Sequence, residues 1–153
     1  MAFNTCFHND LRSVIPILPL VPELDVADLK ASLNVYVRIF GFRVLAERPE
    51  EGFAYLDLEG AHLMLEEVSG PGRRFRTAPL ERPYGRGVNL QIRVANVDAL
   101  YEKVKHAGLA VIAPMEERWY RQGAVERGNR QFVVADIDGY LLRFFSDLGP
   151  RSV

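Results

Sequence analysis

The stretch Val26-Ala27-Asp28-Leu29-Lys30-Ala31-Ser32-Leu33 returns in outline, later in the chain, as Val94-Ala95-Asn96-Val97-Asp98-Ala99-Leu100-Tyr101. In each copy an apolar strand end leads through Asp28 or Asn96, residue types that cap helix N-termini, into a helix that we expect to end at Gly41 or Gly108. A supersecondary unit that is built twice predicts a functional cleft between the two copies.

Strand patterns and turn residues surround each predicted helix. In the first copy we expect strands at residues 18–26, 42–47, 52–58 and 61–67, and in the second at 88–94, 109–112, 117–121, 131–135 and 140–145. Gly123 and Asp138-Gly139 supply two of the turns, and we assign the latter no chemistry. Together these elements predict an α+β fold of two βαβββ modules.

The module boundaries follow from these patterns. We expect an N-terminal arm over residues 1–17, a first module over 18–68, a connecting loop over 69–87 and a second module over 88–148, all within one structural domain.

Composition excludes several classes of partner. A formal net charge of −1 argues against nucleic acid, because phosphate binding normally requires a basic face. The longest apolar stretch, residues 14–21, is short and broken by Pro16 and Pro19, so no membrane span is expected. A single cysteine cannot form an internal disulfide, which favours a reducing, cytoplasmic setting.

Three motifs in this order resemble the vicinal oxygen chelate superfamily, which includes glyoxalase I, extradiol dioxygenases and bleomycin resistance proteins. They are residues 28–36 followed by Gly41-Phe42, residues 94–100, and residues 136–144. The stretch at 82–87, Arg118-Trp119-Tyr120 and the Leu-Leu-Arg-Phe-Phe ending look most like the bleomycin resistance branch. The resemblance implies that the two modules form a curved mixed sheet with a cleft.

The resemblance also implies four metal-ligand positions, which fall near Val21, Met64, Asn89 and Arg143 in this chain. A guanidinium stays protonated, offers no lone pair to a metal, and repels a dication. We therefore predict a metal-free protein with no cofactor and no catalytic residue. The alternative is a metal-dependent lyase or dioxygenase with a noncanonical site around His62 and Glu66.

Period-two alternation predicts which side chains face the cleft. The candidate ligand-binding residues are Glu23, Asp25, Phe53, Tyr55, His62, Glu66, Asn89, Gln91, Trp119 and Arg143. Two alternatives remain open. The charged residues could pair with one another across a solvated sheet, and Trp119 could pack with its strand neighbours rather than stack on a ligand.

The connecting loop carries the basic segment Arg73-Arg74-Phe75-Arg76. Glycines and prolines around it favour a mobile, solvated loop. The other interpretation is a lid that becomes ordered over a ligand.

The function that the resemblance implies is sequestration. A homodimer would hold a small molecule, a glycopeptide antibiotic of the bleomycin type or another amphiphilic ligand, in clefts at the subunit interface and leave it unchanged. A third possible class is a dimeric interaction module that binds no small ligand.

Overall fold

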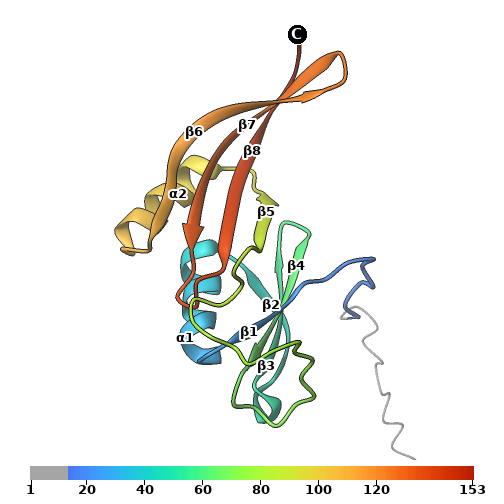
Figure 1. Cartoon of the computed structure of the whole chain (residues 1–153), viewed down its shortest axis with the longest axis vertical. Helices are drawn as coiled ribbons and strands as arrows, with labels where there is room; N and C mark the ends of the chain where they lie inside the picture. Colours follow the sequence, from blue (N-terminus) through green and yellow to red (C-terminus); the bar gives the residue numbers. More distant parts are fainter. Residues whose placement is uncertain (1–13) are drawn as a thin grey trace, which may run out of the picture.

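The computed structural model describes residues 14–153, so most of the expected N-terminal arm lies outside the described residues. The first sheet has the strand order β1-β4-β3-β2, and the second has the order β5-β8-β7-β6 (Figure 1). The first module comprises β1 (Glu23–Val26), α1 (Leu29–Leu33), η2 (Asn34–Phe40), β2 (Arg43–Arg48), η3 (Pro49–Glu51), β3 (Phe53–Leu58) and β4 (Ala61–Glu67). The second comprises β5 (Asn89–Arg93), α2 (Val97–His106), β6 (Val111–Gln122), β7 (Val125–Ala135) and β8 (Leu141–Ser152).

The two helices begin where the sequence predicts. The Asp28 carboxylate accepts a hydrogen bond from the Ala31 amide at 2.9 Å, and the Asn96 side chain accepts one from the Ala99 amide at 3.0 Å. Each cap satisfies one of the amides that the first helical turn leaves unpaired. The first helix ends at Gly41, whose φ of 89° is the left-handed conformation expected of a C-terminal glycine.

Several strand boundaries differ from the prediction. The first strand is confined to β1 because Pro19 and Pro22, which precede it, have no amide hydrogen to donate. The strands expected at 109–112 and 117–121 are one strand, β6, whose irregular register on the edge of the sheet accommodates Pro114. β7 and β8 also run further than expected, so a ribbon of β6, β7 and β8 projects beyond β5 (Figure 1).

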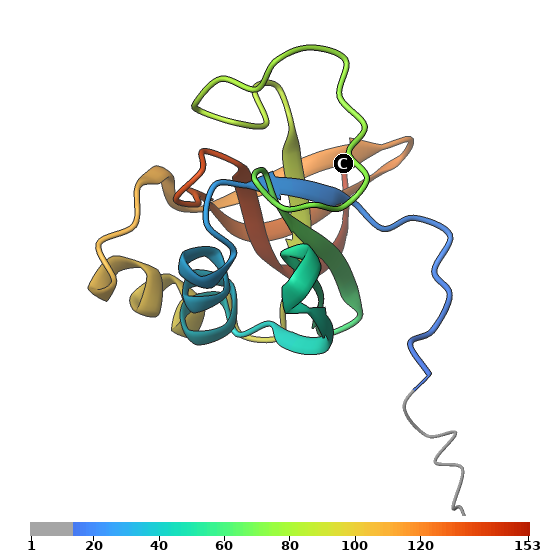
Figure 2. The ribbon, with the colours of Figure 1, turned by 90° about the horizontal axis from the view of Figure 1, so that it is seen from below.

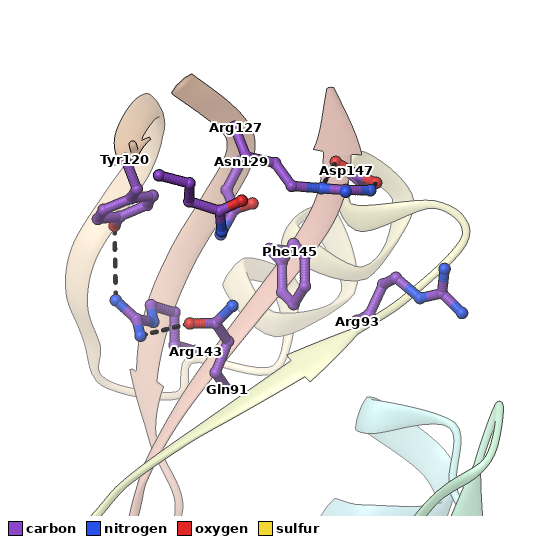
Figure 3. Close-up of a pocket in the computed structure, with 9 residues that line it drawn as sticks. Gln91, Arg93, Tyr120, Arg127, Asn129, Arg143, Phe145 and Asp147 are labelled. Carbon is purple, nitrogen blue, oxygen red and sulfur yellow. Dashed lines mark hydrogen bonds and ion pairs between the residues drawn. The ribbon is translucent and has the colours of Figure 1, made fainter. Parts of the chain in front are cut away.

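The two faces of the sheets differ in what covers them. The helices lie on one side of the sheets and the connecting loop at 69–87 lies on the other (Figure 2). On the face of the second sheet that points away from α2, the strands present polar side chains (Figure 3). This polar face is where a ligand can reach the sheets.

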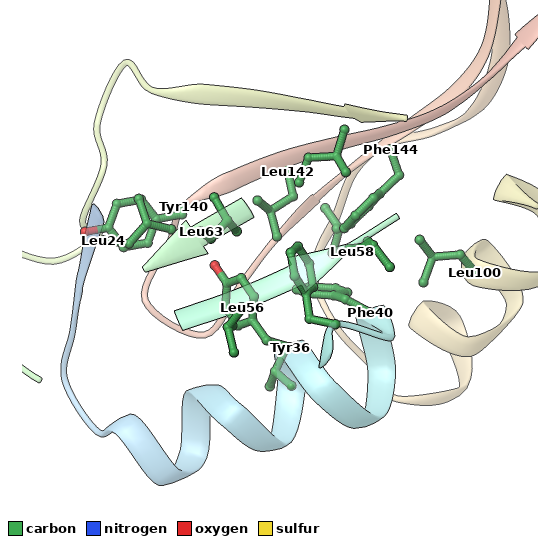
Figure 4. Packing of buried hydrophobic residues seen from close by; sticks show 14 of the residues in the cluster. Leu24, Tyr36, Phe40, Leu56, Leu58, Leu63, Leu100, Tyr140, Leu142 and Phe144 are labelled. Atoms are coloured by element: carbon green, nitrogen blue, oxygen red, sulfur yellow. The ribbon is translucent and has the colours of Figure 1, made fainter. Parts of the chain in front are cut away.

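The helix-facing sides of both sheets share one hydrophobic core (Figure 4). Leu56 and Leu142, from different sheets, are completely buried. The rings of Phe40 and Phe144 meet with their centroids 5.2 Å apart and join the first module to the second. Burial of each such side chain stabilises the fold by about 1.5–3 kcal/mol. Residues of both modules therefore contribute to the same hydrophobic core.

Buried polar groups also join the modules. The Tyr36 hydroxyl donates to Asp136 Oδ2 at 2.8 Å, and the Asp138 carboxylate accepts from Ser32 Oγ at 3.3 Å and Arg82 Nη2 at 2.7 Å. The turn at Asp138-Gly139 is confirmed, with Gly139 at a φ of 98°. The role of this turn is larger than the sequence indicated, because Asp136 and Asp138 connect it to the first module.

Within residues 14–153, every helix is too short or too polar to span a bilayer.

Candidate functional site

The polar face of the second sheet carries an open cavity of about 350 Å³ (Figure 3). Strand alternation builds it, because Arg143 and Phe145 point into the cavity whereas the intervening Phe144 is buried in the core. The cavity is lined by Gln91, Arg93, Tyr120, Gln122, Arg127, Asn129, Arg143, Phe145 and Asp147. We refer to it as the second-sheet pocket.

Arg143 is held in this pocket by neutral groups. Its Nη2 donates to Gln91 Oε1 at 2.5 Å and its Nη1 lies 3.5 Å from the Tyr120 hydroxyl (Figure 3). The Tyr120 hydroxyl accepts a second hydrogen bond, from Gln131 Nε2 at 2.8 Å. Arg143 Nε and Gln131 Oε1 are buried and have no hydrogen-bond partner in the described chain. Hydrogen bonds to Gln91 and Tyr120 thus fix the Arg143 guanidinium in place, and no carboxylate within residues 14–153 forms an ion pair with it.

One ion pair lies in the same pocket. Arg127 donates to both carboxylate oxygens of Asp147, and this hydrogen bonding lowers the pKa of Asp147. Arg93, like Arg143, has no carboxylate within ion-pair distance among residues 14–153. The pocket thus carries three guanidinium groups and one carboxylate, so it has an excess of positive charge.

The polar face of the first sheet carries the opposite charge. Glu23 and Asp25 of β1 lie beside Met64 and Glu66 of the parallel strand β4. Burial, together with the nearby Glu23 carboxylate, raises the pKa of Glu66 to about 7. Neighbouring carboxylates disfavour each other's ionisation. The negative charge of these carboxylates is therefore stabilised only if positively charged side chains from another part of the chain lie beside them.

The connecting loop supplies those cations. Arg74 Nη1 donates to Glu66 Oε1 at 2.7 Å, and Arg76 donates to both carboxylate oxygens of Asp25, at 2.7 and 3.2 Å. The prediction of a solvated loop is wrong for Arg74, whose side chain is largely buried, but it holds for Arg76, which stays exposed while it pairs with Asp25. It agrees with Phe75, which is 76% exposed. The acidic face pairs with the loop and not with Arg93 or Arg143.

His62 belongs to a separate chain of hydrogen bonds on this face. Its Nδ1 lies 3.1 Å from the Tyr55 hydroxyl and its Nε2 lies 3.3 Å from Asp57 Oδ1. Burial opposes ionisation of Asp57, but hydrogen bonds from Arg43 and the Gly60 amide lower its pKa. Both ring nitrogens of His62 therefore already have partners.

The side chains present do not fit the divalent metal that the fold implies. His62 and Glu66 are four residues apart in β4, which places their Cα atoms about 13 Å apart. Glu66 is paired with Arg74, and Arg143 stands where the resemblance implies a carboxylate ligand. Among residues 14–153, no three His, Cys, Asp or Glu side chains are arranged to hold an ion. The alternative metal site around His62 and Glu66 gains no support.

The structure divides the ten predicted ligand-binding residues into groups. Only Gln91 and Arg143 line the second-sheet pocket. Six belong to the strands of the first sheet, at alternating positions on its polar side: Glu23, Asp25, Phe53, Tyr55, His62 and Glu66. Asn89 opens β5 two residues before Gln91 and does not line the pocket.

Trp119 lies outside the pocket. Its ring packs beside Gly128, and the Arg151 guanidinium sits 3.9 Å from the ring centroid. The neighbouring Tyr120 points to the other face of β6 and enters the pocket instead. Of the two interpretations of Trp119, the structure agrees with packing against its strand neighbours.

Sequence reasoning missed the pocket residues on the projecting ribbon, Arg127, Asn129 and Asp147. They lie in parts of β7 and β8 where we did not expect strands. No alternation of polar and apolar residues marks this stretch, because Glu126 and Arg130, on the opposite face of the strand, are charged as well.

Comparison with known proteins identifies the family. The model of the Glyoxalase/Bleomycin resistance protein/Dioxygenase superfamily matches residues 21–144. Bleomycin resistance proteins of Geobacillus stearothermophilus and Staphylococcus aureus are each 29% identical over 138 residues, covering 86% of this chain and 98% of theirs.

Solved structures agree with this assignment. TioX from Micromonospora sp. ML1 is 25% identical, with a TM-score of 0.64 over 84% of this chain and 98% of TioX. A glyoxalase/bleomycin resistance protein/dioxygenase from Alicyclobacillus acidocaldarius, 19% identical with a TM-score of 0.57 over 84% of this chain and 90% of its own, shows the same fold. The predicted α+β architecture of two modules is confirmed, and the chain belongs to the glyoxalase/bleomycin resistance protein/dioxygenase superfamily.

Proposed function

We propose that this protein captures an amphiphilic small molecule on the polar faces of its sheets and leaves it chemically unchanged. The observation that carries the proposal is Arg143, fixed by Gln91 and Tyr120 inside a cavity of about 350 Å³, at the position where the fold implies a metal-ligating carboxylate. A cavity of this size, with aromatic walls and a few positioned polar groups, is typical of small-molecule sites. The similarity to relatives named bleomycin resistance proteins supports a ligand of the bleomycin type or a related compound.

A second copy of the chain would complete the cleft in this proposal. In a single chain the second-sheet pocket is open on one side. On the first sheet Asp25 and Glu66 already pair with Arg76 and Arg74, whereas the Glu23 carboxylate is exposed. Placing the first sheet of one subunit opposite the second sheet of its partner would bring the Glu23 carboxylate toward the positively charged second-sheet pocket. Such complementarity favours association.

The ligand class follows from the lining. Cationic and amide groups of a glycopeptide antibiotic of the bleomycin type would suit the carboxylates of the first sheet. The second-sheet pocket offers guanidinium, amide and aromatic groups in addition. A ligand that spans both faces must therefore be amphiphilic and carry hydrogen-bonding groups along its length.

Calorimetry tests the proposal. Metal-free bleomycin and a library of amphiphilic antibiotics would be titrated into the full-length protein, and each ligand recovered afterwards for mass spectrometry. Saturable binding of at least one compound, one per chain and with unchanged mass, would support capture. Turnover of the bound compound, or no binding by any member of the library, would refute it. Light scattering coupled to size exclusion tests the dimer separately.

A further inference from the structure

We propose that the second-sheet pocket binds an oxyanion of the ligand, so that the captured molecule is an aromatic carboxylic acid or carries such a group. This inference rests on the proposed function and specifies the chemistry of one half of its cleft. It differs from the cationic character expected of a bleomycin-type ligand, which the acidic first sheet would suit.

Unpaired positive charge is the first observation. Most arginines in the described chain have a carboxylate within ion-pair distance, as Arg74 and Arg127 do. Arg93 and Arg143 have none, although both line the same cavity. The single carboxylate of the pocket, on Asp147, is already engaged on both oxygens by Arg127. An anion that enters therefore meets two guanidinium groups that form no direct ion pair within residues 14–153.

Positioned donors are the second observation. A guanidinium has five N–H donors in a planar fork that matches two carboxylate oxygens. Gln91 and Tyr120 fix the plane of the Arg143 guanidinium, but they accept hydrogen bonds from only two of its N–H groups. The buried Nε–H of Arg143 has no partner within residues 14–153. A fork that is already oriented binds an anion with little further loss of side-chain freedom.

Aromatic surface is the third observation. The Phe145 ring lies between Arg143 and Arg93, and the Tyr120 ring forms the wall on the far side of Arg143 (Figure 3). A flat ring can therefore lie on apolar surface while a carboxylate at its edge reaches a guanidinium. A simple inorganic anion would use only the charges and leave this surface exposed.

The test uses three matched probes: 2-naphthoate, 2-naphthamide, and 2-naphthylmethylamine, which is cationic at pH 7. Affinities would be measured by calorimetry for the full-length protein and for Arg143→Met and Arg93→Met, which shorten neither side chain greatly but remove the charge. Arg121→Met is the matched control. Arg121 belongs to the same ribbon, but it lies between two pocket residues and so points to the opposite face, and its Nε donates to the Gly123 carbonyl.

We expect naphthoate to bind at least about tenfold more tightly than naphthamide, since a hydrogen bond to a charged group contributes about that much. Each pocket substitution should remove most of this preference, leave the naphthamide affinity unchanged and leave the thermal midpoint close to that of Arg121→Met. Equal affinities for the acid and the amide, a preference for the amine, or no binding of any probe would overturn the inference. The antibiotic library would still report capture in each of those cases, so the two failures are distinguishable.

Discussion

The hydrogen bond between Tyr36 and Asp136 allows a sharp test of how the two modules are held together. Tyr36 is completely buried, and its hydroxyl donates to Asp136 Oδ2 across a sequence separation of 100 residues. The other carboxylate oxygen of Asp136 accepts from the amides of Asp138, Gly139 and Tyr140. The substitution Tyr36→Phe removes one hydrogen bond and preserves the ring.

The magnitude follows from burial and charge. A hydrogen bond to a charged group contributes about 1.5–3 kcal/mol, and no water is expected to replace a hydroxyl in a completely buried position. We expect Tyr36→Phe to lower the free energy of unfolding by about 2 kcal/mol, which for a chain of this size lowers the thermal midpoint by roughly 4–8 °C.

The loss should also depend on pH. Burial raises the pKa of Asp136, and the hydrogen bond from Tyr36 opposes that rise. Without the hydroxyl, the pKa in the folded state rises further, so the carboxylate form is disfavoured more at neutral pH. Below the pKa of Asp136 in the unfolded chain the carboxyl is protonated in both states, and this contribution vanishes. The difference between variant and wild type should therefore be largest near pH 7 and shrink on acidification.

Urea unfolding followed by Trp119 fluorescence and far-UV circular dichroism measures the effect. Tyr101→Phe is the control, because the Tyr101 ring packs on Phe132 with centroids 4.9 Å apart but its hydroxyl has no hydrogen-bond partner within residues 14–153. If Tyr36→Phe lowers the free energy of unfolding by no more than the control does, under about 0.5 kcal/mol, the hydrogen bond between Tyr36 and Asp136 does not stabilise the contact between the two modules.

Three further predictions, with Gly60→Ala as the control in the first, test the fold by urea unfolding. Gly139→Ala should lower the free energy of unfolding by more than about 2 kcal/mol, because the φ of Gly139 is 98° and a Cβ there would overlap the Pro83 side chain. Gly60→Ala, at a φ of 91° with open space around it, should lower it only by the backbone strain of about 1 kcal/mol. Equal losses for the two variants would contradict this account. Phe144→Ala should cost about 3–5 kcal/mol, since Phe144 is completely buried in the core, and a loss below 1 kcal/mol would be incompatible with that packing. Glu66→Gln should flatten the pH dependence of stability. The pKa of Glu66 is raised from 4.5 to about 7 in the folded state, so its contribution to stability is complete below pH 4.5 and is lost as pH rises through 7. An unchanged slope of stability against pH between pH 5 and 8 would argue against a raised pKa.

Features that depend on local patterns could be predicted from the sequence. Helix caps at Asp28 and Asn96 need only a side chain and the next few amides, so their positions were correct. Alternation along the short strand β5 and the start of β8 is uninterrupted, and it correctly placed Gln91 and Arg143 on one face. The architecture followed because both modules repeat the same local signals.

Alternation could not be followed along β6. Its register with β7 shifts between Val111 and Ala113 and again before Glu116. Each irregularity can exchange the two faces for every residue that follows, so the sequence pattern alone could not show that Tyr120 enters the pocket whereas Trp119 leaves it.

The sequence by itself determined the two-module architecture, the helix boundaries and the basic residue at position 143, because each depends on residue type and local spacing. Only the tertiary structure decided which charges meet. Arg74 and Arg76 neutralise the acidic face of the first sheet from a loop with no periodic pattern, and that pairing leaves Arg93 and Arg143 unmatched in the second. Ion pairs act over a few ångströms in space whatever the separation along the chain, so the charge of each face became known only once the chain had folded.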